Sequence, residues 1–197
     1  MICPSVRDHQ TIPPVVIIGV GNILLSDEGI GVHVVRALGR QRLTRRIELI
    51  DGGTGGLVLL NTMLHRERVI IVDAVSLRAP PASVFCWEPG DCRDRRSPFL
   101  SAHTEGVQDI VQAGRMLFLL PPILCIGVVP RDMTTPGSSL SRTLRRRLPI
   151  IARVVLCEAI GRRRVHISVV GRGILGDRKV GNHNIVVPHM QYMQRRR

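Results

Sequence analysis

Short apolar runs alternate with amphipathic stretches along most of the chain. The runs are rich in β-branched residues, which is typical of strands buried on both faces of a sheet. They cover residues 15–18, 47–50, 69–72 and 123–129. Apolar residues at helical spacing predict helices from 28 to about 40 and from 140 to about 160. This alternation predicts an α/β fold of three layers, with a mostly parallel central sheet and helices on both faces.

Weaker patterns fill the remaining positions. Thr54 is the expected N-cap of a helix that ends near residue 64. Residues 83–88 show some of the alternation of a strand, and residues 104–119 show the spacing of a helix. We therefore expect further elements on the same sheet.

The domain limits follow from where the pattern begins and ends. Residues 1–14 form a leader without periodicity, and residues 15–160 form a single α/β domain. Residues 161–197 form a basic C-terminal extension, for which we expect poor order because glycines and charges interrupt its two candidate strands, 165–170 and 184–187.

The composition is that of a soluble globular protein, with 44% hydrophobic and 22% charged residues. No apolar run is long enough for a transmembrane helix, and the first residues lack the apolar core of a secretory signal. The sequence therefore predicts a cytoplasmic protein with no membrane partner. Its five cysteines are odd in number and form no CxxC pair, which argues against a disulfide framework or a zinc knuckle.

The net charge of +13 changes this picture little. The extension 161–197 carries eight arginines and one lysine against a single aspartate, which accounts for +8 of the total. The chain has only three Phe, one Tyr and one Trp, so aromatic platforms for stacking bases are scarce. We therefore expect no nucleic-acid partner, although a basic nucleic-acid-binding or scaffold protein remains an alternative.

Three candidate metal ligands follow predicted strands. Glu28 lies in the loop after the first strand, within VVIIGVGNILLSDEGIG, and Asp73 ends the third strand. His103 begins the helix predicted at 104–119. Ligands of α/β proteins bind beyond the carboxyl ends of the strands, where these residues are expected to meet. Two carboxylates and an imidazole suit a borderline divalent metal such as nickel or zinc.

Each of the three residues also has a purely structural interpretation. Glu28 is a favourable acid for the first turn of a helix, because it complements the helix dipole. Asp73 is able to cap its own loop backbone, and His103 to act as a cap or a surface residue. The spacing alone leaves these alternatives open.

Several ordered segments resemble one known family. The segment GVGNILLSDEGIGVHVV at 19–35 is similar to the signature of the hydrogenase maturation proteases. The resemblance continues in order through IELIDGGTGGLVLL, VIIVDAV, SAHTEGVQDIV and CIGVVPRDMTTPGSSLS, and covers roughly residues 15–160. The sequence is thereby identified as a candidate member of this family.

The resemblance implies a specific function. The family's metal-binding residues fall on Glu28, Asp73 and His103, while Asp51 matches a further acid and is an accessory candidate. Members are endopeptidases that remove a short C-terminal peptide from the large-subunit precursor of a nickel–iron hydrogenase. The nickel is supplied by the precursor and serves as the recognition element, and no organic cofactor is implied. The resemblance does not identify a catalytic residue apart from these metal-site residues.

Two other enzyme classes remain as alternatives. The glycines of Gly19-Val20-Gly21, together with Asp51 at the end of the second strand, are typical of a Rossmann-like dinucleotide-binding enzyme. However, Leu24 stands where the third glycine belongs, and the nearby acids would repel a pyrophosphate. A Cys92–His103 pair would indicate a different hydrolase, although no motif surrounds Cys92.

Overall fold

The computed structural model describes residues 13–88 and 120–161, together with the backbone of three two-residue strands between 174 and 186. His103, Cys92 and the helix expected at 104–119 lie outside the described residues, as do residues 1–12 of the leader and most of the extension.

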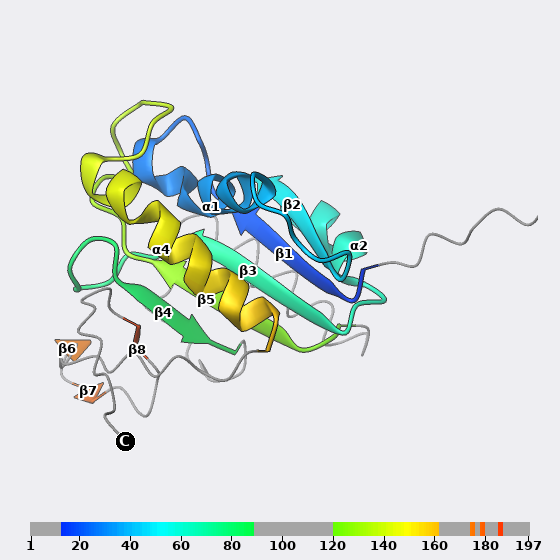
Figure 1. The fold of residues 1–197 in the computed structure, drawn as a ribbon. Helices are drawn as coiled ribbons and strands as arrows, with labels where there is room; N and C mark the ends of the chain where they lie inside the picture. The colour runs from blue at the N-terminus through cyan, green and yellow to red at the C-terminus, as the bar shows by residue number, and fades with distance from the viewer. Residues whose placement is uncertain (1–12, 89–119, 162–173, 176–177, 180–184, 187–197) are drawn as a thin grey trace, which may run out of the picture.

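Within residues 13–88 and 120–161 the elements follow the predicted order, with the boundaries shifted by a few residues (Figure 1). The candidate strand at 165–170 lies outside the described residues, and the sequence pattern does not predict β6 and β7. The strands are β1 (Val15–Val20), β2 (Ile47–Gly53), β3 (Arg68–Ala74), β4 (Val84–Trp87), β5 (Ile123–Val128), β6 (Ile174–Leu175), β7 (Arg178–Lys179) and β8 (Ile185–Val186). The helices are η1 (Ser26–Gly29), α1 (Ile30–Gly39), η2 (Leu57–Leu59), α2 (Leu60–Met63) and α4 (Arg142–Ala159), where η denotes a 3-10 turn.

The central sheet is mostly parallel, as predicted. Within the described residues its strand order is β2-β1-β3-β5-β4-β8, and β2, β1, β3 and β5 run parallel. Strand β4 is antiparallel to β5 and pairs on its other side with β8, at one of the candidate strands of the extension. After β1 the chain forms β2 on one side of it, and then returns to form β3 on its other side. The order in which strands are added to the sheet therefore reverses between β1 and β3.

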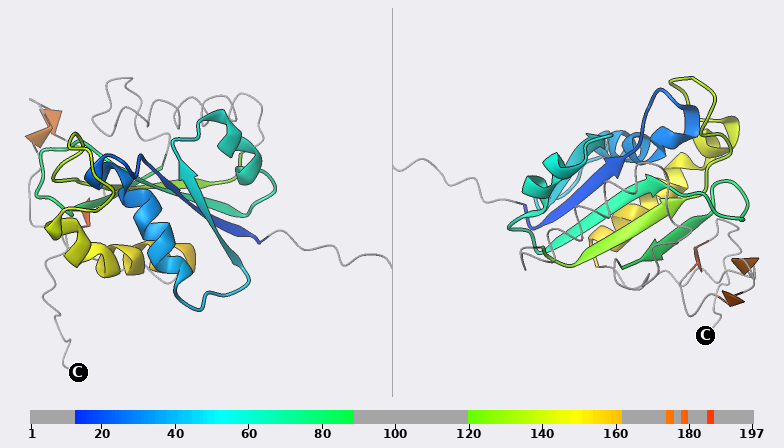
Figure 2. Two further views of the ribbon diagram at one scale, coloured as in Figure 1. Left: turned by 90° about the horizontal axis from the view of Figure 1, so that it is seen from above. Right: turned by 180° about the vertical axis from the view of Figure 1, so that it is seen from behind.

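Helices cover both faces of this sheet, which gives the predicted three layers (Figure 2). Helices α1 and α4 pack side by side on one face, where Ile17 of β1 joins their buried residues in a single core. On the other face, α2 contributes Met63 to a second core that contains Val16 and Ile18. Alternate residues of β1 therefore enter opposite cores, which explains why the strand is apolar without interruption.

Helix α1 approaches the sheet so closely that only glycine fits at the contact. A Cβ at Gly31 would overlap the carbonyl oxygens of Val20 and Val72, and a Cβ at Gly19 would overlap the carbonyl group of Gly31. Gly21 turns the chain after β1 with φ of +125°, a conformation that side chains disfavour. The glycines of the first loop therefore permit a tight turn and a close helix–sheet contact.

One helix prediction is wrong at its start. Thr54 does not cap a helix, because residues 54–56 form a loop and the 3-10 turn η2 precedes α2 at Leu60. The amide of Gly55 donates to the carbonyl of Gly52 over 2.8 Å, which closes a turn in place of a first helical turn. The four glycines at positions 52, 53, 55 and 56 explain this result, because glycine disfavours helix formation.

The close contact of α1 predicts the outcome of a simple substitution. Gly31→Ala should lower the free energy of unfolding by about 1–3 kcal/mol, because the overlapped atoms belong to the backbone and have little freedom to move. Urea unfolding measures this change. Gly56→Ala is the matched control, because a Cβ there has nothing within 4 Å, and we expect a change of at most about 0.5 kcal/mol. Equal free energies of unfolding for the two variants would contradict the close contact of Gly31 with the backbone of the sheet.

Candidate functional site

Glu28 lies in the 3-10 turn η1, between β1 and α1. Its side chain is buried, with 5% of the residue exposed. The amide of Glu28 donates to the carbonyl of Leu25 over 3.1 Å, and η1 packs against β3. The residue is therefore placed at the carboxyl end of β1, beside the neighbouring strand.

Asp73 lies near the carboxyl end of β3, as the sequence predicts. It is 4% exposed, and its Oδ1 accepts a hydrogen bond from the amide of Ala74 over 2.7 Å. Strand β3 pairs with β1, so that Gly19 lies opposite Val72, one residue before Asp73. Asp73 and η1 therefore lie at the same edge of the sheet, on the two strands between which the chain order reverses.

This position is where open α/β sheets bind ligands, in the crevice at the topological switch point. Both side chains are carboxylates, and carboxylate oxygen is a ligand type that divalent metals accept. The edge therefore carries two residues whose chemistry is compatible with a metal ion.

The third predicted ligand, His103, lies outside the described residues. Among the residues that the structure describes, no group of three or more His, Cys, Asp or Glu side chains is arranged to hold a metal. The structure thus brings the turn of Glu28 to the strand of Asp73, and the complete three-ligand site stays a prediction.

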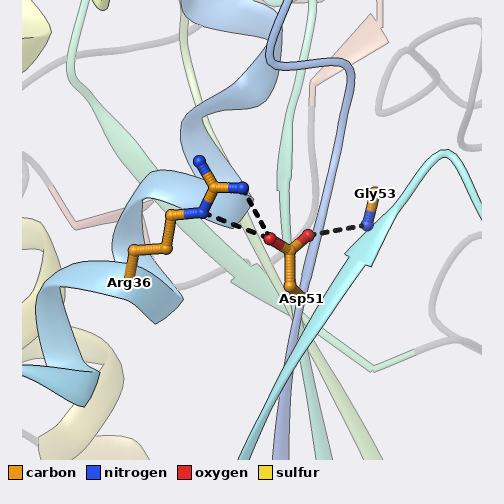
Figure 3. Close-up of polar contacts among 3 residues, drawn as sticks. All are labelled: Arg36, Asp51 and Gly53. Atoms are coloured by element: carbon orange, nitrogen blue, oxygen red, sulfur yellow. Dashed lines mark hydrogen bonds and ion pairs between the residues drawn. The ribbon is translucent and has the colours of Figure 1, made fainter.

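Asp51 lies near the carboxyl end of β2, at the same edge of the sheet, and is held by two neighbours (Figure 3). Its Oδ2 accepts hydrogen bonds from Nη2 and Nε of Arg36 over 2.9 Å and 3.2 Å, and its Oδ1 accepts from the amide of Gly53 over 3.2 Å. The register places Asp51 opposite Gly19 of β1. The side chain is 42% exposed, in contrast to the buried Glu28 and Asp73, so an accessory role would be played from the surface.

Sequence reasoning missed the role of Asp27. Its side chain is fully buried, and its carboxylate accepts backbone hydrogen bonds from Arg131, Asp132 and Ser141 in the loop between β5 and α4. These partners are more than a hundred residues away in the sequence, so no local pattern identifies them. The motif GVVPRDMTTPGSSLS contains the partner loop, but nothing in it indicates which acid it meets.

Comparison with known proteins decides the family. The family model described as hydrogenase maturation protease matches residues 32–158, which is more than half of the chain. The chain belongs to this family. The resemblance seen in the sequence is thereby confirmed, as is the enzyme class that it implies, an endopeptidase.

Similar proteins cover most of this maturation protease. The hydrogenase 2 maturation protease of Escherichia coli (strain K12) is 35% identical over 77% of this chain and 98% of its own. The hydrogenase expression/formation protein HoxM of Azotobacter vinelandii is 32% identical over 75% of this chain and 72% of its own. The structure of the hydrogenase maturating endopeptidase HybD from E. coli covers 75% of this chain and 93% of its own, with a TM-score of 0.64 and 30% identity.

The structure also explains why the first loop has the appearance of a dinucleotide-binding motif. Gly19 supports the packing of α1, and Gly21 supports the turn, so both glycines have structural functions. Leu24, at the position of the third glycine, is 64% exposed. Together with the family assignment, these features favour the maturation protease over the dinucleotide-binding alternative.

In the described residues no helix is long and apolar enough to cross a membrane.

His33 of α1 provides a titratable group close to the site. Within the described residues its Nε2 is buried and has no hydrogen-bond partner. Burial and the nearby Arg36 lower the pKa of His33 below its ordinary value of 6.5, against the opposing effect of Asp27 and Asp51. The folded protein therefore favours neutral His33, whereas the unfolded chain binds the proton more readily.

This shift predicts how stability depends on pH. The contribution of His33 to the free energy of unfolding is fully present above pH 6.5. It is lost as the pH falls below that value towards the lowered pKa of His33 in the folded state. Urea unfolding measures the free energy of unfolding at about pH 7.5 and about pH 5.5. Its decrease between the two pH values should be larger for the wild type than for His33→Gln. The remaining titratable groups are common to both proteins, so equal losses would contradict the lowered pKa.

Proposed function

We propose that this maturation protease removes a short C-terminal peptide from the nickel-loaded large-subunit precursor of a nickel–iron hydrogenase. Nickel belongs to the precursor and is recognised by Glu28, Asp73 and His103. The observation that carries the proposal is the placement of two buried carboxylates, Glu28 and Asp73, at the switch point of the sheet. The family assignment supports the partner, and cytoplasmic action on a newly made precursor is part of the proposal.

Recognition of a metal that is already held by another protein is part of this proposal. The buried Glu28 and Asp73 supply two carboxyl groups at the carboxyl edge, and His103 is expected to add an imidazole. Three protein ligands leave positions open on a four- or six-coordinate metal. Thiolates of the precursor would occupy these positions, so that a precursor without nickel lacks the feature that the site binds.

The proposed reaction is ordinary peptide hydrolysis. The oxygen of a water molecule adds to the scissile carbonyl carbon, the carbon–nitrogen bond breaks, and a proton from the water passes to the leaving amine. A metal beside the scissile bond polarises the carbonyl or activates this water. Asp51, held by Arg36 at the same edge, is proposed as an accessory acid.

A processing assay tests the proposal. Nickel-loaded and nickel-free precursors are incubated with the full chain, and the loss of the C-terminal peptide is read as a decrease in mass. We expect cleavage of the loaded form alone. Equal cleavage of both forms would contradict recognition of nickel, and cleavage of neither would contradict the proposed substrate.

The same assay tests the ligands. Glu28→Gln keeps the size of the side chain but removes its charge, and should abolish processing because a neutral amide binds a divalent metal weakly. Glu67→Gln is the matched control, because Glu67 is exposed and pairs with Arg46. Glu67 directly precedes β3, so it lies at the other end of the strand from Asp73. Normal processing by Glu28→Gln would contradict the ligand assignment.

A further inference from the structure

A buried carboxylate connects the turn of Glu28 to a distant loop. The Oδ2 atom of Asp27 accepts hydrogen bonds from the amides of Arg131 and Asp132 over 2.9 Å and 3.2 Å. Its Oδ1 atom accepts one from the amide of Ser141 over 2.6 Å. Asp27 is 0% exposed, so these bonds to a charged group form away from water, where such bonds are strong.

Backbone hydrogen bonds run beside this carboxylate. The amide of Asp27 donates to the carbonyl of Asp132 over 3.0 Å, and the amide of Ser26 donates to the carbonyl of Gly137 over 2.8 Å. In return, the amide of Gly137 donates to the carbonyl of Leu24 over 2.8 Å. The loop of residues 129–141, here called the β5–α4 loop, is therefore joined to residues 24–27 on both sides of the carboxylate.

The same carboxylate reaches the start of α4. Ser141 is the N-cap of this helix, and its Oγ accepts a hydrogen bond from the amide of Leu144 over 3.4 Å. Helix α4 packs against α1, which follows η1 directly. The turn η1 is thus held on one side by α1 and on the other by the β5–α4 loop through Asp27.

We propose that Asp27 is a positioning residue for the proteolysis, which fixes the turn of Glu28 against the β5–α4 loop. This inference rests on the proposed function. Glu28 is the next residue in a turn of four, so a movement of Asp27 moves the backbone of Glu28 as well. Both carboxylate oxygens of Asp27 accept bonds from the loop, which assigns them to the loop and not to the metal. Metal sites depend on such supporting groups for the orientation of their ligands.

The first test replaces one acceptor oxygen with an amide group that is a donor. Asp27→Asn should lower kcat for the nickel-loaded precursor about 10- to 100-fold and weaken the binding of Ni²⁺ to the full chain to a similar extent. The first quantity comes from the processing assay, and the second from calorimetric titration with Ni²⁺ alone. Both are measured well below the melting temperature of the variant, with circular dichroism as the check of folding.

Ser26→Ala is the matched control. The Oγ of Ser26 donates to the carbonyl of Thr135 over 2.8 Å, across the same two segments, but Thr135 is exposed and Ser26 is only partly buried. We expect this variant to keep the wild-type kcat and Ni²⁺ affinity. A loss equal to that of Asp27→Asn would show that any weakening of the contact has the same effect, and would overturn the specific role of Asp27.

A second measurement needs no variant and therefore remains valid if Asp27→Asn does not fold. Because coupling between two sites is reciprocal, Ni²⁺ bound beside Glu28 should stabilise the hydrogen bonds that Asp27 accepts. Hydrogen exchange at the amides of Arg131, Asp132 and Ser141 in the wild type should slow about tenfold on addition of Ni²⁺. Unchanged exchange in the nickel-bound protein would overturn the inference.

The outcomes separate the two levels of the proposal. A folded Asp27→Asn variant with wild-type kcat and Ni²⁺ affinity would overturn the positioning role alone, because the wild type would still process the precursor. Failure of the wild type to cleave the nickel-loaded precursor would instead overturn the proposed function, and the inference with it.

Discussion

The contact between helix α1 and the sheet determines where the candidate site lies. Because Gly31 has no side chain, the first turn of α1 lies against the carbonyl oxygens of Val20 and Val72, one on each of the two strands that flank the crevice. The turn η1 immediately precedes this contact, so Glu28 is delivered to the edge at which β3 ends with Asp73 and Ala74. Every larger residue at position 31 would displace the helix, and with it the turn that carries Glu28.

The β5–α4 loop supports the same turn from the other side. Its own geometry is stabilised by Asp132, whose Oδ1 accepts hydrogen bonds from the amides of Thr134 and Thr135. Hydrogen bonds from these threonines hold the pKa of Asp132 well below its usual range, so the side chain is ionised at every ordinary pH. The loop is thus shaped by one carboxylate and attached by another, Asp27.

The sequence predicts the layers of the fold well because burial leaves a strong pattern. Strands β1, β3 and β5 are apolar on both faces, so they are recognisable without any knowledge of their neighbours. The end of a strand and the start of a helix leave weaker patterns. The expected helix from Thr54 fails because glycines govern the local backbone, which a single favourable N-cap residue does not reverse.

The candidate site is predictable only in part for a related reason. Glu28 and Asp73 follow strands, so the rule for carboxyl edges is enough to bring them together. The partners of Asp27 and the ion pair of Asp51 with Arg36 depend on how separate elements pack. Such contacts are set by the tertiary structure and have no counterpart in local spacing. His103 lies outside the described residues, so its place as a ligand rests on the sequence.

The arrangement of charge gives the site its character. Glu28 and Asp73 are buried at an edge where two parallel strands end, so water would only weakly screen an ion that contacts them. The proposed function assigns these two carboxylates to a nickel ion that the precursor carries.

The most direct measurement is a crystal structure of the full chain with Ni²⁺, with the metal located by anomalous scattering at the nickel absorption edge. We expect a nickel ion at the carboxyl ends of β1 and β3, coordinated by the carboxylates of Glu28 and Asp73 and by the imidazole of His103. A nickel ion bound elsewhere, with neither carboxylate among its ligands, would contradict it.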